Sequence, residues 1–74
     1  MAKTIYSKEH GYLVEKLKKA RLEAGLDQAA AAKLLKKSQS YISKIESGQR
    51  RIDVIQLKKF ADIYKKGLNY FLKK

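Results

Sequence analysis

Cationic side chains are the residues of this sequence best able to do chemistry, and that chemistry is ion pairing. The chain holds 18 Lys and Arg against 7 Asp and Glu, and its formal net charge at pH 7 is +11. Such an excess suits a polyanionic partner: DNA, RNA or an anionic membrane surface. Doublets such as Lys36-Lys37 and Arg50-Arg51 are separated by apolar residues, which favours a folded charged surface over a disordered basic tail.

The sequence offers few residues that could catalyse a reaction or bind a metal. The sequence has no Cys, and its single His is His10, so thiolate zinc sites and cysteine nucleophiles are excluded. No carboxylate pair, Ser–His pair or Gly-rich phosphate loop is visible, so we expect no enzyme, no catalytic residue, no metal site and no cofactor. Neither a long apolar run nor a signal peptide is visible, which predicts a cytoplasmic, nucleoid-associated protein with no membrane partner.

Helical periodicity sets the elements that must position these charges. Residues 1–12 show no clear period and are predicted to form an N-terminal arm, and residues 13–72 a single all-α domain. The N-cap candidates of the helices that follow are Asp27, Ser38 and Asp53. The apolar stripe expected to face the core in the last part of the chain comprises Val54, Leu57, Ala61, Tyr64, Leu68 and Phe71, with Gly67 breaking it before a short fifth helix.

Residues 27–48 have the spacing of a helix-turn-helix, in which a first helix crosses a DNA backbone and a second enters the major groove. The small Ala31 and Ala32 permit a close crossing of the two helices, and Ile42 and Ile45 give the second helix an apolar inner face. Its outer face carries hydrogen-bonding side chains at Gln39, Ser40, Ser43 and Lys44. The spacing alone also fits two ordinary helices of a bundle.

Two stretches resemble a known family. The segment 25–28 (GLDQ) and the segment 38–51 (SQSYISKIESGQRR) are similar to the phage repressor and Cro family of XRE-type regulators. The resemblance covers about residues 13–72. It implies a five-helix bundle of the lambda-repressor-like type, whose second and third helices form the DNA-binding pair.

The resemblance also implies residue roles. The residues matching positions that face base edges are Gln39, Ser40, Ser43 and Lys44. The residues implied to contact the DNA backbone are Gln28, Lys36, Lys37, Tyr41, Gln49, Arg50 and Arg51. For Lys44 the alternatives are a phosphate contact and a solvated side chain. For the Tyr41 ring the alternatives to a backbone contact are packing on a thymine methyl and simply covering the helix. Arg21 and Glu46 match a structural salt bridge of many members.

The sequence departs from the family at several positions. Lys36 and Lys37 occupy the turn where the family usually has a glycine and an apolar residue. We therefore expect either a positive φ at Lys36, at some energetic cost, or an irregular turn. Ala31 replaces a common leucine and Ile52 a common proline, and neither change removes a DNA-contacting position.

The sequence predicts a sequence-specific regulator of transcription that binds double-stranded DNA, and specifically a repressor that binds a palindromic operator as a homodimer. One recognition helix reads only a few base pairs, so a second copy is needed for a unique site. The predicted dimer interface comprises Ile55, Ile63, Tyr70 and Leu72, for which a wide core face or scattered apolar surface residues are the alternatives. The alternative function is an antitoxin-type protein whose main partner is a toxin, with DNA binding for autoregulation.

Overall fold

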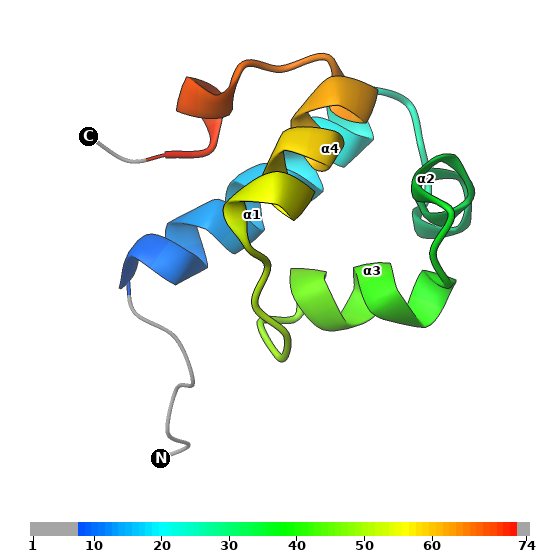
Figure 1. Cartoon of the computed structure of the whole chain (residues 1–74), viewed down its shortest axis with the longest axis horizontal. Coiled ribbons are helices and arrows are strands. Elements are labelled where there is room, and N and C mark those ends of the chain that lie inside the picture. The colour runs from blue at the N-terminus through cyan, green and yellow to red at the C-terminus, as the bar shows by residue number, and fades with distance from the viewer. Residues whose placement is uncertain (1–7, 73–74) are drawn as a thin grey trace.

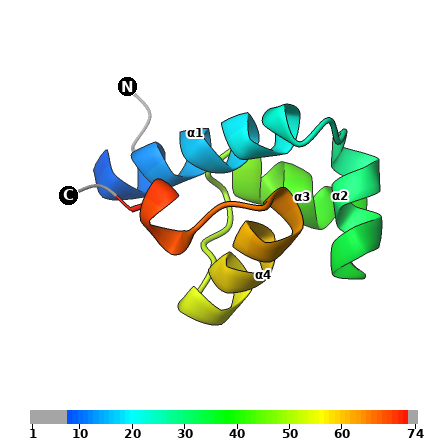
Figure 2. The ribbon, with the colours of Figure 1, turned by 90° about the horizontal axis from the view of Figure 1, so that it is seen from above.

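The computed structural model describes residues 8–72, and this range is all-helical, with no strand. Its elements are α1 (Lys8–Glu23), α2 (Gln28–Leu35), α3 (Gln39–Glu46), α4 (Val54–Tyr64) and the 3-10 turn η1 (Leu68–Tyr70), arranged as in Figures 1 and 2. The all-α prediction is confirmed. The prediction of five helices is wrong, because the segment expected to form the fifth is only the single turn η1, after which Phe71 inserts into the core.

The first helix begins earlier than the sequence suggested. Residues 8–12 belong to α1, so this helix includes part of the segment predicted to form an arm, and residues 1–7 of that segment lie outside the described range. The middle of α1 contacts η1, because the Lys16 Nζ lies 4.7 Å from the Tyr70 ring centroid. The same Nζ lies 5.4 Å from the ring centroid of Tyr12, one turn earlier in α1.

The three predicted N-caps are confirmed. The side chains of Asp27, Ser38 and Asp53 accept hydrogen bonds from backbone N–H groups three residues further on, at 2.8, 3.2 and 2.8 Å. Each bond satisfies an amide that has no partner inside its helix. The caps therefore fix where α2, α3 and α4 begin.

Two helices end on lysines in the left-handed region. Lys36 closes α2 with φ 61° and Lys65 closes α4 with φ 59°. The N–H groups of the following residues, Lys37 and Lys66, then donate to Ala32 and Ala61 carbonyls, both at 2.9 Å. The positive φ expected at Lys36 is confirmed, while Gly67, expected to break the last helix, has an ordinary φ of −79°.

The core lies where the helices meet (Figure 2), and its largest fully buried side chains are Phe60, Phe71, Leu17, Ile42 and Ile45. Two members of the predicted stripe are exposed instead, Val54 by 71% and Leu68 by 37%, whereas Phe60, outside that stripe, is 1% exposed. Periodicity predicts the buried face of a helix but not how far along it the neighbouring helices reach.

Candidate nucleic-acid interface

α3 presents one polar face and one apolar face. Ile42 and Ile45 are 0% and 1% exposed, and they anchor the helix on the core. The four side chains predicted to read bases are all exposed: Gln39, Ser40, Ser43 and Lys44. Figure 1 shows α3 along one edge of the molecule, and the exposure of these four side chains places its polar face on the surface.

α2 crosses close to α3 because its contact residues are small. Ala31 and Ala32 are buried, and their methyl groups let the two backbones approach. The Lys36–Ser38 turn joins the helices through the left-handed Lys36 and the Ser38 cap. The fold of residues 27–48 is therefore a helix-turn-helix, as the spacing predicted.

A buried ion pair fixes α3 to α1. The Nε and Nη2 groups of Arg21 donate to the two carboxylate oxygens of Glu46 at 2.7 and 3.0 Å. Both side chains are nearly buried, with exposed fractions of 9% and 4%. Donation to the Glu46 carboxylate raises the pKa of Arg21, and the Arg21 Nη1 also donates to the Leu26 carbonyl at 3.0 Å. Glu46 therefore lies inside the fold, as a structural residue.

Two glutamines extend this network to the surface. The Gln28 Nε2 donates to Glu46 Oε1 at 3.1 Å, and Gln39 Nε2 donates to Gln28 Oε1 at 3.4 Å. These hydrogen bonds join Arg21 of α1 to Glu46 near the end of α3, and then join Glu46 through Gln28 of α2 to the start of α3. It restricts the rotamers of Gln28 and Gln39, the two polar residues that begin α2 and α3.

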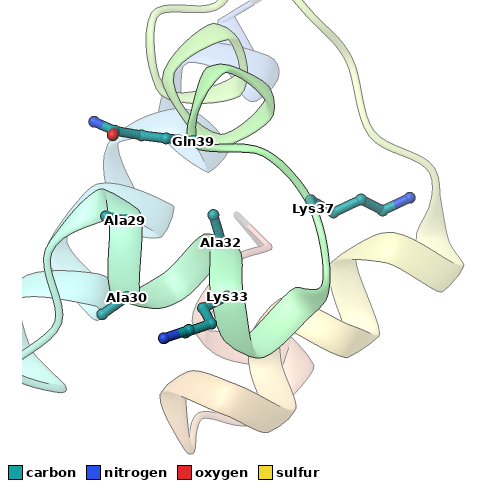
Figure 3. Close-up of a pocket in the computed structure, with 6 residues that line it drawn as sticks. All are labelled: Ala29, Ala30, Ala32, Lys33, Lys37 and Gln39. Atoms are coloured by element: carbon teal, nitrogen blue, oxygen red, sulfur yellow. The ribbon is translucent and has the colours of Figure 1, made fainter.

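A shallow depression of about 510 Å³ lies between α2 and the start of α3 (Figure 3). Three alanines, Ala29, Ala30 and Ala32, form its low surface. Gln39 and Lys37 also line it, and their side chains extend in opposite directions from the turn. Lys33, which no sequence motif marks, is a further cation at this depression.

The loop after α3 folds back over the end of that helix. The backbone N–H groups of Gln49 and Arg50 both donate to the Lys44 carbonyl, at 2.9 and 3.2 Å, and the Gln49 side chain donates to Ser47 Oγ at 3.0 Å. The exposed side chains of Gln49, Arg50 and Arg51 therefore lie beside the C-terminal end of α3, while Lys36 and Lys37 are exposed before its N-terminal end.

Tyr41 is held against α4. Its hydroxyl donates to Gln56 Oε1 at 3.0 Å, and its ring stacks on Phe60 with centroids 6.5 Å apart and an interplanar angle of 6°. The ring therefore packs between α3 and α4, and a contact of Tyr41 with the DNA backbone stays a prediction. Gln56 was missed, because its partner is fifteen residues away in the sequence and no local signal marks the pair.

The four residues of the predicted dimer interface do not share one environment. Ile55 and Leu72 are 66% and 50% exposed, whereas Ile63 and Tyr70 pack against the core cluster. Ile63 and Tyr70 are half-buried, so they offer less side-chain surface to a second copy than Ile55 and Leu72 do. Val54, adjacent to Ile55, adds a second exposed apolar side chain at the start of α4.

Neither a metal site nor a membrane span is found in the described range 8–72. No group of three His, Cys, Asp or Glu side chains there could hold a metal ion. No helix in that range is long and apolar enough to cross a membrane.

Comparison with known proteins identifies the class. The helix-turn-helix family model matches residues 17–71, and the chain belongs to this family, the XRE-type DNA-binding regulators of transcription. The fold is similar to the crystal structure of the restriction-modification controller protein C.AhdI from Aeromonas hydrophila. That match has a TM-score of 0.75 and 25% sequence identity, and it covers 89% of this chain and all of that one. No curated protein sequence matches significantly.

Proposed function

We propose that this protein is a repressor that binds a palindromic operator as a homodimer, with α3 reading bases in the major groove. The observation that carries the proposal is the polar face of α3, where Gln39, Ser40, Ser43 and Lys44 are exposed while the opposite face is locked into the core. A recognition helix needs this combination, because base contacts demand a rigid support.

Direct readout falls mainly to two side chains. A glutamine pairs bidentately with adenine, and a lysine donates to guanine O6 and N7, so Gln39 and Lys44 carry most of the discrimination in this proposal. The bond from Gln39 to Gln28 restricts the orientation of the Gln39 amide. Ser40 and Ser43 accept several bases and also act through water.

Phosphate contacts come from the residues that flank α3. Lys36 and Lys37 precede the helix, and Arg50 and Arg51 follow it, so the four cations bracket the proposed reading face. Gln28 and Gln49 add uncharged donors. The alanine side chains on the surface of α2 are short, so a DNA strand can approach these four cations closely.

Two copies are needed for a unique site. Paired recognition helices about 34–36 Å apart read half-sites one helical turn apart. In this proposal the exposed apolar residues Val54, Ile55 and Leu72 form the contact between copies. Repression then follows from occupancy of the operator. The likeness to a controller protein supports the regulatory role.

Binding to a random-sequence duplex between 50 and 200 mM salt tests whether the cations form an oriented surface. If a dimer makes about 6–10 phosphate contacts, affinity falls by about 10³–10⁵ over this range. The double variant Lys36→Ala/Lys37→Ala reduces the salt slope by about 2 per protomer. The charge-matched control Lys18→Ala/Lys19→Ala, on α1, leaves it nearly unchanged. Equal losses in both variants would contradict a DNA-binding face around α3.

A further inference from the structure

Tyr41 contacts a cation from each side of α3. The Lys37 Nζ lies 5.2 Å from its ring centroid, and the Arg50 Cζ lies 5.0 Å from the same point. Lys37 precedes the helix and Arg50 follows it, so one aromatic ring joins the two loops that flank α3. Both distances are within the range in which a ring face attracts a cation.

The ring itself cannot turn away easily. Phe60, which is 1% exposed, stacks on it at an interplanar angle of 6°, and the hydroxyl bond to Gln56 fixes its outer end. The position of Tyr41 is thus set by α4, and the two cations rest on a fixed support.

A cation on a ring face keeps donors for other partners. An ammonium has three N–H donors and a guanidinium five, and a ring face occupies few of them. Lys37 and Arg50 can therefore contact Tyr41 and a phosphate oxygen at the same time. Held in this way, each side chain loses less rotamer freedom when DNA binds.

We propose that Tyr41 is a positioning residue that holds Lys37 and Arg50 ready as a two-armed clamp for the phosphates on either side of the recognition helix. This proposal rests on the proposed function, because it assigns a role within the same DNA interface. It gives Tyr41 an action through the two cations rather than through a contact of its own with a base.

The first test needs no DNA. Protons near an aromatic face are shifted upfield in NMR spectra, so the Lys37 Hε and Arg50 Hδ resonances of the wild-type protein are expected upfield of their ordinary positions. Tyr41→Leu removes these shifts, and the conservative variant Tyr41→Phe retains them. Ordinary positions in the wild-type protein would overturn the clamp whatever the protein binds.

The second test is a double-mutant cycle on a random-sequence duplex at fixed salt. Tyr41→Leu weakens binding about tenfold, the effect of releasing two ordered side chains. Tyr41→Phe restores binding to within about twofold. In the Lys37→Ala/Arg50→Ala background the same Tyr41→Leu change has almost no effect, because the residues it positions are gone.

The outcomes separate the two proposals. An equal loss from Tyr41→Leu in both backgrounds would mean that Tyr41 acts by packing alone, which overturns the clamp and leaves the proposed function standing. Failure of the wild-type protein to bind any duplex would overturn the proposed function, and the phosphate role of the clamp with it. Thermal unfolding checks that each variant is folded, and Tyr41→Met replaces Tyr41→Leu if the latter is not.

Discussion

Replacing either left-handed lysine by glycine is expected to stabilise the protein. Lys36 and Lys65 have φ values of 61° and 59°, and both side chains are exposed, so neither change removes buried surface. The left-handed conformation costs an L-residue about 1–2 kcal/mol. Glycine avoids that cost but loses about 0.5–1 kcal/mol more backbone entropy on folding. At the midpoints of these two ranges the net gain in the free energy of unfolding is about 0.75 kcal/mol for each variant, or about 3–6 °C in Tm at this size.

Thermal and urea unfolding of Lys36→Gly, Lys65→Gly and the double variant measure this gain. The two sites end different helices and share no contact in the structure, so the gains should add. Lys36→Gly should also weaken DNA binding by removing a phosphate contact, while Lys65→Gly should not. Unchanged or lowered stability in both variants would refute the strain argument. A gain in stability in one variant alone would refute the strain argument for the other site.

Three further predictions concern the core pair, a titrating side chain and the dimer. Glu46→Gln leaves the buried Arg21 charge without its counter-charge, so the free energy of unfolding measured in urea should fall by about 3–5 kcal/mol. The whole free energy of unfolding is about 4–11 kcal/mol for a chain of this length. The double variant Arg21→Met/Glu46→Leu should lower the free energy of unfolding much less than Glu46→Gln does. A larger loss in the double variant would be inconsistent with an uncompensated charge. Burial, followed by repulsion from Arg51, lowers the pKa of His10 below 6.5. The unfolded chain therefore binds more protons between the two values, so stability is lost as pH falls below about 6.5. His10→Gln should flatten that part of the profile, and an identical profile in the variant would rule His10 out as its cause. Ile55→Glu should raise the dimer dissociation constant about 30-fold in sedimentation, since an unpaired charge resists burial; an unchanged constant would exclude Ile55 from the interface.

Features set by a few neighbouring residues could be predicted from the sequence. The caps at Asp27, Ser38 and Asp53 depend on a side chain and an amide three residues away, and the left-handed turn at Lys36 depends on the end of one short helix. The polar and apolar faces of α3 follow from helical spacing, with Ile42 buried. These features carry most of the candidate interface.

Features set by distant contacts could not be predicted. The contact of Lys16 in α1 with Tyr70 in η1 joins distant parts of the sequence, and the burial of Phe60 and exposure of Val54 depend on where neighbouring helices lie along α4. The support of Tyr41 by Gln56 and Phe60 joins α3 to α4 across a loop. Its role as a platform for two cations is therefore visible only once the helices are placed.

Whether α3 reads DNA sequence is measured by selecting bound duplexes from a random DNA pool, with the wild-type protein and Lys44→Ala side by side. We expect an inverted repeat whose half-sites are one helical turn apart, and we expect Lys44→Ala to change the preferred base at one position in each half-site. Bound DNA without a shared motif, lost as salt rises, would contradict this expectation, because the charge would then bind DNA without α3 reading the sequence.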